Sequence, residues 1–283
     1  MKTIKTIIAA ALISITAAAQ AQELVIRIDD MGALHSVNVA SVDTYQNGIA
    51  KSAEVLVVGP WFPEAVKMLK ENPGLDAGVH LAITSEWENV KWRPLTDCPT
   101  LVDENGYFYP MMSPNPAYPG QSVMENMKNF DIKEIEKEFR AQIELAKKNI
   151  PQLSHISGHM MSTGFNKEVA EVVKKLAEEY GLSTVDRARY GYEGISYAGP
   201  KTTSEEKIAS FIKALDKMEK GKKYLFLDHP AYNDSEMQTV MHIGYEDVPV
   251  DRQGVTDLLK SPEVKKEIEK RGIKLISIGE LVK

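Results

Sequence analysis

Short apolar runs, separated by segments with helical spacing, recur along the chain from residue 24 onward. Seven of these runs are rich in β-branched and aliphatic residues and are nearly continuous rather than alternating. Such runs are typical of parallel strands that are covered on both faces. The predicted strands span residues 24–28, 55–58, 77–83, 153–157, 182–186, 224–227 and 274–278.

Three amphipathic helices are predicted between the strands. In the first, apolar residues recur at helical spacing, Asp131 and Glu134 form a capping box, and Pro151 ends the helix. Strands that alternate with helices predict an α/β fold, here a distorted (β/α) barrel of about seven parallel strands. The other two helices start at Asn166 and at about Ser204, and end at Gly181 and by Gly221.

Three stretches do not fit this alternation. Residues 86–128, 188–203 and 230–256 show little periodicity and are predicted to be irregular connections. Long loops inside a compact domain are usually lids or binding loops. In a barrel they would gather over the mouth, where side chains from separate loops share one site.

The first residues have the layout of a cleavable secretory signal. Lys2 and Lys5 precede an apolar run at residues 7–19, and the small residues Ala19-Gln20-Ala21 follow. The run is shorter than the roughly 20 residues that a membrane span needs. We therefore expect residues 1–21 to be a signal peptide, residues 22–283 to form one domain, and the protein to be periplasmic or secreted without a membrane anchor.

Charge and cysteine content exclude several classes of protein. Residues 1–21 carry two lysines and no acidic residue, so their removal changes the formal net charge from −6 to −8. A surface of that sign repels nucleic acid and anionic lipid. Cys98 is the only cysteine. An exported chain of this kind must be stabilised by its core and not by disulfides.

Polar side chains lie in or just beyond five of the predicted strands. Active sites of parallel barrels form at the C-terminal ends of the strands, so these are the candidate functional residues. Asp29 and Asp30 follow the first strand, His80 lies in the third, His159 follows the fourth, Asp186 and Arg187 end the fifth, and Asp228 and His229 follow the sixth.

Each candidate also has a purely structural explanation. Adjacent aspartates after a strand often form a turn or cap a helix, and His80 is equally compatible with a hydrogen-bonded core residue. His155 and His159 could both bind one metal. Alternatively, one could bind the metal while the other contacts and orients a ligand. His35 and His242 have no strand-end position and are predicted to lie on the surface or in loops.

Taken together, one carboxylate and two imidazoles predict a catalytic metal site. Three protein ligands leave positions open for water and substrate. A divalent ion there lowers the pKa of its water toward ~7 and polarises a carbonyl group. The other of the two adjacent aspartates, which does not bind the ion, is then placed to accept a proton from that water. Zinc, magnesium and other divalent ions all suit such ligands, so the identity of the ion stays open.

The same residues resemble a known family, the YdjC-like carbohydrate deacetylases. The family pattern is a strand followed by ADDFG, then G-[LM]-H, H-x-D-x-H-x-H and C-H-P. Order and spacing agree from about residue 24 to the C-terminus. The corresponding segments here are IDDMG at 28–32, GVH at 78–80, HISGH at 155–159 and DHP at 228–230, and VDRARY at 185–190 is similar to the family's arginine-bearing strand.

The resemblance implies a distorted barrel in the style of polysaccharide deacetylases, and a role for each matching residue. The implied roles are Asp29 as general base, His229 as general acid or transition-state stabiliser, Asp30, His80 and His159 as metal ligands, Arg187 as a substrate-binding residue, and His155 as a support behind the ligands.

The chain departs from the family pattern at several positions. Ser157 replaces the central aspartate of H-x-D-x-H, and Met31 replaces the phenylalanine of ADDFG. The histidines that usually follow are replaced by Met160, Met161 and Ser162. Because a metal-bound imidazole normally has an acceptor behind it, another group is expected to orient His155 or His159.

The predicted function is metal-dependent removal of an N-acetyl group from an amino sugar or an acetylated oligosaccharide. A glycoside hydrolase is an alternative, but it needs two carboxyls about 5 to 9.5 Å apart across the bond. A non-catalytic glycan-binding barrel and an iron oxygenase are further alternatives, and a homodimer is compatible with the sequence. Five aromatic residues are candidates to stack on sugars or simply to pack the loops: Trp61, Trp87, Trp92, Tyr107 and Tyr109.

Overall fold

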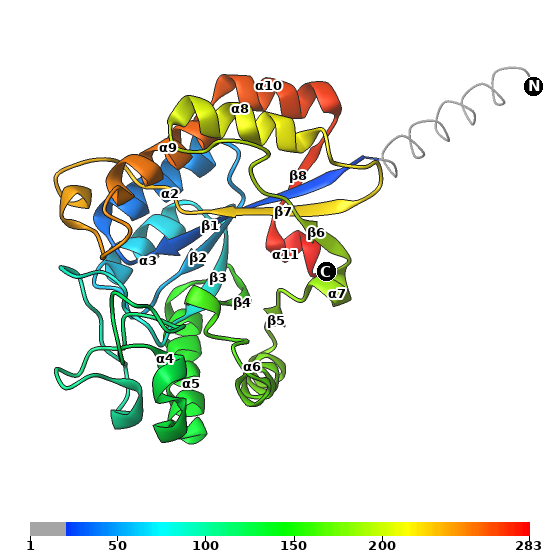
Figure 1. The fold of residues 1–283 in the computed structure, drawn as a ribbon. Helices are drawn as coiled ribbons and strands as arrows, with labels where there is room; N and C mark the ends of the chain where they lie inside the picture. The colour runs from blue at the N-terminus through cyan, green and yellow to red at the C-terminus, as the bar shows by residue number, and fades with distance from the viewer. Residues whose placement is uncertain (1–20) are drawn as a thin grey trace, which may run out of the picture.

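A computed structural model describes residues 21–283. Eight parallel strands form one curled sheet, a half-barrel with β1 near its centre (Figure 1). Seven strands follow the order β5-β4-β3-β2-β1-β7-β6, and β8 pairs with β1. The strands are β1 (Glu23–Met31), β2 (Ser52–Val55), β3 (Asp76–Leu81), β4 (Leu153–Gly158), β5 (Ser183–Thr184), β6 (Tyr192–Gly194), β7 (Lys223–Asp228) and β8 (Lys274–Ile276).

The predicted α/β barrel of about seven parallel strands is confirmed. Every predicted run overlaps an observed strand, and β6 is the one strand that was not predicted. Within residues 21–283 no pairing joins β5 to β6, so the barrel stays open on that side. The predicted signal peptide falls almost wholly outside the described residues.

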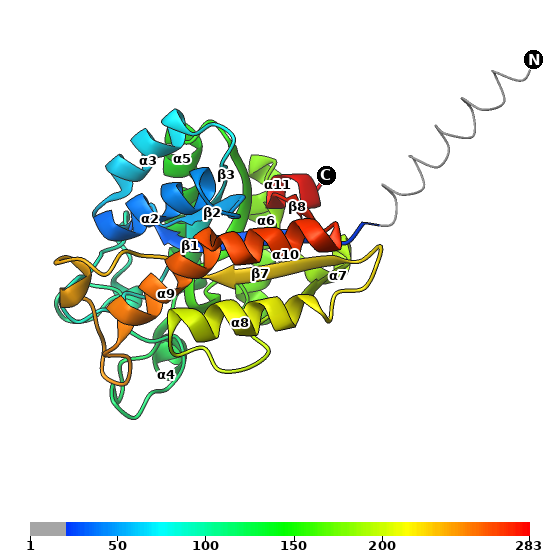
Figure 2. The ribbon, with the colours of Figure 1, turned by 90° about the horizontal axis from the view of Figure 1, so that it is seen from above.

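Helices pack around the curled sheet, with α8 and α10 on one side of the molecule and α5 and α6 on the other (Figures 1 and 2). Among the described helices, none combines the length and apolarity needed to cross a bilayer. The helices are α2 (His35–Gln46), α3 (Phe62–Glu71), α4 (Val123–Asn126), α5 (Ile132–Asn149), α6 (Lys167–Tyr180), α7 (Arg187–Tyr190), α8 (Ser204–Leu215), α9 (Val248–Lys260), α10 (Pro262–Arg271) and α11 (Ile278–Leu281).

The three predicted helices correspond to α5, α6 and α8, but one predicted cap is wrong. Asp131 does cap α5, by accepting a hydrogen bond from the Lys133 backbone N–H at 2.9 Å. Glu134 does not complete a capping box; it accepts hydrogen bonds from the backbone N–H and hydroxyl of Thr100 at 2.9 and 2.6 Å. The Glu134 carboxylate therefore makes a tertiary contact instead of the local hydrogen bond from the Asp131 backbone N–H that a capping box requires.

The stretch 230–256 is less irregular than predicted, because α9 begins at Val248 and α9 packs against α8. The long connections at 82–122 and 229–247 lie on the side toward which β1 points (Figure 1). That side is the C-terminal end of the strands, as expected for a barrel mouth.

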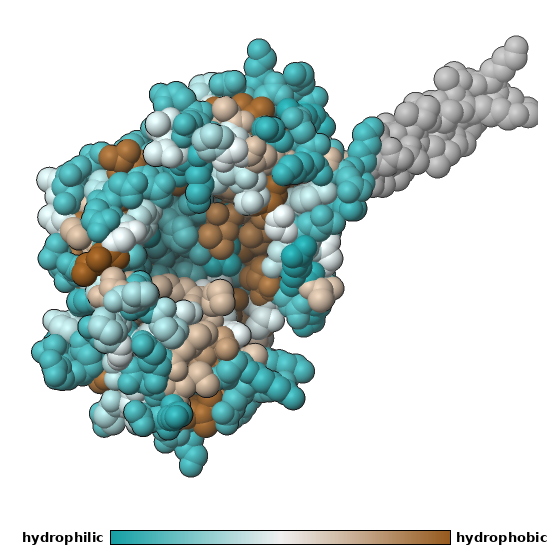
Figure 3. Space-filling model, viewed as in Figure 1, coloured by the Kyte–Doolittle hydropathy of each residue, from teal (hydrophilic) through white to brown (hydrophobic). Residues whose placement is uncertain are grey.

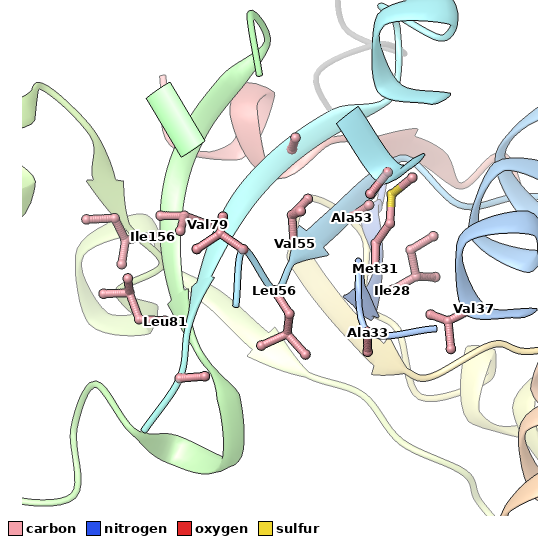
Figure 4. Packing of buried hydrophobic residues seen from close by; sticks show 14 of the residues in the cluster. Ile28, Met31, Ala33, Val37, Ala53, Val55, Leu56, Val79, Leu81 and Ile156 are labelled. Carbon is pink, nitrogen blue, oxygen red and sulfur yellow. The ribbon is translucent and has the colours of Figure 1, made fainter. Parts of the chain in front are cut away.

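Buried aliphatic residues form a row across neighbouring strands. Val55, Val79 and Ile156 are register partners on β2, β3 and β4 and lie side by side (Figure 4). Each is at most 2% exposed, which stabilises the fold by about 1.5–3 kcal/mol per side chain. Strand residues alternate between faces, so Glu54 on β2 and Ser157 on β4 point to the opposite face, the interior of the half-barrel.

Candidate metal centre and active site

A break in the regular geometry of β1 brings Asp29 and Asp30 to one side. Adjacent residues of a regular strand point to opposite faces of the sheet. Here the register between β1 and β2 shifts between Ile28 and Met31, and Asp30 has a φ of 72°, in the left-handed region. Both carboxylates therefore face one imidazole: His80 Nε2 lies 3.6 Å from Asp29 Oδ2 and 3.8 Å from Asp30 Oδ1.

Gly32 completes this turn. Its φ is 98°, and a Cβ at this position would lie 2.6 Å from the carbonyl oxygen of Leu56. Its backbone N–H donates to Asn38 Oδ1 at 2.7 Å. The glycine of IDDMG is therefore needed both for its backbone conformation and for the close approach of the next strand.

Asp29 is held by an arginine from its own strand. Arg27 Nε donates to Asp29 Oδ1 at 2.6 Å, and Arg27 Nη2 donates to Oδ2 at 2.7 Å. Both side chains are nearly buried, with 11% and 4% of their surface exposed. This two-point contact fixes the plane of the carboxylate.

Asp30, His80 and His159 form a compact set of possible metal ligands. One ligand atom from each lies within 4.8 Å of the others, and all three residues are buried. Arg252 Nη2 donates to Asp30 Oδ2 at 2.9 Å. Burial raises the pKa of Asp30, but the positive charge of Arg252 outweighs burial and holds that pKa well below its usual range. The carboxylate is therefore ionised.

The second nitrogen of His80 is engaged by Ser157. His80 Nδ1 lies 2.8 Å from Ser157 Oγ, and the Ser157 hydroxyl donates to Glu54. Because that hydroxyl has one proton, Ser157 can only accept from Nδ1. Burial lowers the pKa of His80 to about 4. The neutral ring therefore carries its proton on Nδ1 and presents a lone pair on Nε2.

His159 is held between two carboxylates. Its Nε2 lies 2.9 Å from Glu86 Oε2, and its Nδ1 lies 3.3 Å from Asp30 Oδ1. Burial lowers the pKa of His159, but the negative charges of Glu86 and Asp30 outweigh burial and raise that pKa to about 10. With Nε2–H bound to Glu86, Nδ1 is the nitrogen that a cation would share with Asp30.

These donors fit a divalent cation. Asp30 Oδ1 is buried and accepts no hydrogen bond of regular geometry; its neighbours are His159 Nδ1 at 3.3 Å and His80 Nε2 at 3.8 Å. A buried charged oxygen that is paired so weakly is costly. The Nε2 lone pair of His80 faces the same oxygen with no proton between them. A cation among the three ligands would satisfy both atoms, and two nitrogens and one oxygen are a common catalytic donor set.

The centre opens into a cavity of about 880 Å³. Its lining includes the metal-ligand set, Trp87 and Tyr245. Figure 3 shows this face of the molecule hollowed between the part that carries α8 and the part that carries α4 and α5. The volume is within the range of sites that enclose small-molecule ligands.

Comparison with known proteins identifies the family. The sequence model described as YdjC-like protein matches residues 23–270. The chain belongs to the YdjC-like family. This YdjC-like chain is 28% identical over 275 residues to a protein named carbohydrate deacetylase from Enterococcus faecalis, covering 92% of this chain and 98% of that one.

Two further relatives are similar over nearly their full length. A protein named carbohydrate deacetylase from Geobacillus stearothermophilus is 27% identical, with 92% of the YdjC-like chain and 98% of that protein covered. A solved structure from Enterococcus faecalis, described as a cellobiose-phosphate cleavage protein, has a TM-score of 0.73 and 26% identity. It covers 92% of this chain and 99% of its own.

His229, the residue expected to act as an acid, lines the same cavity after β7. Its Nδ1 lies 3.6 Å from Asp228 Oδ1, and its side chain is 34% exposed. Burial lowers the pKa of His229, but the negative charge of Asp30 and the contact with Asp228 outweigh burial and raise that pKa above its usual value. The YdjC-like chain thus brings His229 toward the centre in a form that readily carries a proton.

Arg187 does not line the 880 Å³ cavity, and its expected position at the end of a strand is wrong. It is the first residue of α7, and its Nε donates to the carbonyl of Tyr192 at 3.2 Å. It lines an adjoining cavity of about 740 Å³, which shares Arg27 and Gly158 with the first. Strand β5 ends at Thr184, and Asp186 caps α7 by accepting from Arg189 N–H. Contact between Arg187 and an extended substrate stays a prediction.

The expected aromatic residues have different environments. Of the five, only Trp87 lines the 880 Å³ cavity. His242, expected in a loop, does lie in one, and it stacks on Trp87 with ring centroids 5.7 Å apart. The other four aromatic residues pack elsewhere: Trp61 against His35, Trp92 against His159, Tyr107 under Arg93, and Tyr109 against Phe130.

Sequence reasoning missed four charged residues of the site: Arg27, Glu54, Glu86 and Arg252. Glu54 directly precedes the apolar run at 55–58. Arg252 lies in a stretch treated as irregular, and Glu86 begins a long loop. Neither carries a local pattern that distinguishes it from a surface charge. His155 is buried and contacts Glu54 at 2.6 Å, behind the ligand set and apart from it.

Proposed function

We propose that this protein is a metal-dependent hydrolase that removes an N-acetyl group from an amino sugar or an acetylated oligosaccharide. The observation that supports it most is the Asp30, His80 and His159 set, in which Asp30 Oδ1 makes no regular hydrogen bond, beside the separately held Asp29. The relatives named carbohydrate deacetylase support the substrate class.

When bound, a divalent cation supplies a Lewis acid that polarises the acetyl carbonyl and acidifies water. Asp29 then accepts the proton of the attacking water. Arg27 holds both oxygens of Asp29, so the base keeps its orientation as the water approaches. Two imidazoles and one carboxylate favour zinc or another transition metal over magnesium.

His229 gives its proton to the leaving amine. We expect His229→Gln to lower kcat/KM by about 10²-fold. Because the pKa of His229 is raised, its protonated form persists below that pKa and is lost as pH rises through it. Activity should therefore fall on the alkaline side in the wild type, and this fall should disappear in His229→Gln. An unchanged alkaline limb in a pH profile of kcat/KM would contradict the assignment.

One experiment tests the proposal as a whole. Metal content of the purified protein is measured, and acetate release is then followed on a panel of acetylated amino sugars and oligosaccharides, with and without chelator. We expect about one ion per chain and release that stops with chelator and returns with metal. Release that survives complete removal of metal would overturn the metal-dependent mechanism.

A glycoside hydrolase is disfavoured by the state of the two aspartates. Such an enzyme needs one carboxyl with a raised pKa to act as an acid. Asp29 is paired with Arg27 and Asp30 with Arg252, at 2.6 and 2.9 Å. Arg252 holds the pKa of Asp30 well below its usual range, so Asp30 is not suited to donate a proton. Both oxygens of Asp29 are occupied by N–H donors of Arg27.

Export of the chain is a separate proposal. It rests on the sequence of residues 1–21, with two lysines, an apolar run and a small-residue end. We expect the mature protein to begin near Gln22. N-terminal sequencing of the protein from the periplasm or medium of an expressing bacterium would test this, and a cell-retained chain that still begins at Met1 would contradict it.

A further inference from the structure

We propose that Glu54 is a positioning residue that sets, through Ser157 and Arg27, the orientation of both a metal ligand and the base. The inference rests on the proposed function, because it concerns the same metal centre. Glu54 lies on β2, is 0% exposed and touches neither the cavity nor the predicted ligand set. It acts only through the side chains that it holds.

The contact with Ser157 determines which nitrogen of His80 carries the proton. A serine hydroxyl can either donate to Nδ1 or accept from it. If Ser157 donated to Nδ1, the proton of His80 would move to Nε2 and point at Asp29 and Asp30. Glu54 takes the hydroxyl proton of Ser157, so Nδ1 must donate and Nε2 keeps its lone pair for a cation.

This arrangement explains how the chain works without the aspartate of the family pattern. Ser157 carries no charge, but its hydroxyl on β4 connects His80 Nδ1 on β3 to the carboxylate of Glu54 on β2, on the other side of β3. A ligating imidazole is usually oriented by such an acceptor. Glu54 supplies the charge, and Ser157 supplies the connection.

The contact with Arg27 reaches the base. Glu54 Oε1 lies 3.5 Å from Arg27 Nε, and the same nitrogen donates to Asp29 Oδ1 at 2.6 Å. The arginine is thus held from two sides by carboxylates on neighbouring strands. Removing one of them leaves the guanidinium, and with it Asp29, less firmly directed.

The strands are built to allow these contacts. Glu54 and His155 lie on β2 and β4, and both are register partners of Gly78 on the strand between them. A Cβ on Gly78 would lie 2.3 Å from His155 Nε2 and 2.4 Å from Glu54 Oε2. The missing side chain lets the two residues meet across β3 at 2.6 Å. His155 thereby holds the carboxylate of Glu54, which in turn holds the hydroxyl of Ser157.

The first test measures metal affinity, which does not depend on the identity of the sugar. Zn²⁺ is titrated into metal-free wild type, Glu54→Gln and Ser157→Ala, and Co²⁺ spectra report ligand geometry. We expect both variants to bind about 10- to 100-fold more weakly, with altered Co²⁺ bands. Glu138→Gln is the matched control: Glu138 is equally buried and accepts hydrogen bonds from Leu95 and Thr96. Its metal affinity should not change.

The second test moves the charge instead of removing it. In Glu54→Gln/Ser157→Asp, a carboxylate lies directly behind His80, while the contact with Arg27 is lost. We expect Zn²⁺ affinity and the Co²⁺ spectrum to return to the wild-type values. Turnover at saturating metal should stay reduced, by up to about 10²-fold, because the base is still misdirected. A merely structural role for Glu54 would not produce this separation.

The outcomes distinguish the two proposals. If the wild type binds Zn²⁺ and releases acetate, and Glu54→Gln has the same affinity and the same acetate release, the role of Glu54 is overturned and the proposed function stands. If Glu54→Gln does not fold, Ser157→Ala with wild-type affinity would overturn that role in the same way. Wild type that binds no divalent ion would instead overturn the proposed function.

Discussion

Asp29→Asn is expected to lower kcat by roughly 10²-fold or more while the protein still binds one metal ion per chain. The amide matches the carboxylate in size but cannot accept a proton from water. The Asp30, His80 and His159 set does not include Asp29, so metal binding should persist. Single-turnover rates and metal analysis on the same sample would separate the two effects.

The effect should be specific to the base. Asp103→Asn removes a carboxylate that serves only its own loop, where it accepts from Asn105 and Tyr107 backbone N–H groups. It should leave kcat unchanged. Asp29→Asn with the turnover of wild type would show that another group deprotonates the water, and metal loss in that variant would make Asp29 a ligand.

Asp30→Asn is expected to weaken metal binding by more than about 100-fold. This loss exceeds the one expected when a residue that only orients a ligand is removed. Asparagine tolerates the left-handed backbone of Asp30, so the turn should survive. The loss removes the charged oxygen and leaves Arg252 buried without its ion pair. Activity at limiting metal should fall in parallel and recover in part at high metal concentration.

The pH dependence of metal binding gives an independent check on this centre. The pKa of His159 is raised to about 10 in the metal-free protein, so a cation must displace a proton from Nδ1 near neutrality. Affinity should therefore rise about tenfold per pH unit as one proton is released. Titrations at several pH values measure the slope. A slope of zero would mean that Nδ1 carries no proton to displace.

The strand ends of the site could be predicted because their signals are local. Buried runs that stop at Asp29 and Asp228 read as strands in the sequence. Asp228 indeed ends β7, and Asp29 lies two residues before the end of the neighbouring strand β1. Parallel strands place such ends at one edge. Asp29, Asp30, His80, His159 and His229 could therefore be gathered from the sequence alone.

Residues that act through packing could not be found in this way. Arg252 comes from α9, where Pro249 and Gly254 obscure the helical pattern. Helix α2 buries Ser36, Asn38, Ser41 and Thr44, so its inner face is not apolar and gives no periodic signal. Arg187 was expected at a strand end for a related reason: β5 spans two residues, and a helix begins where a longer strand was expected.

The pairing of β1 determines the order in which this protein can fold. On one side β1 pairs with β7, and its first residues also pair with β8, whose Lys274 is 251 residues further along the chain from Glu23. Contacts between such distant segments form slowly, because the intervening chain must be closed into a loop first. Strand β1, which carries both aspartates, is synthesised before the other strands of the sheet but acquires its last neighbours only after β7 and β8 have been made. A nascent chain truncated before β7 should therefore have no assembled catalytic end.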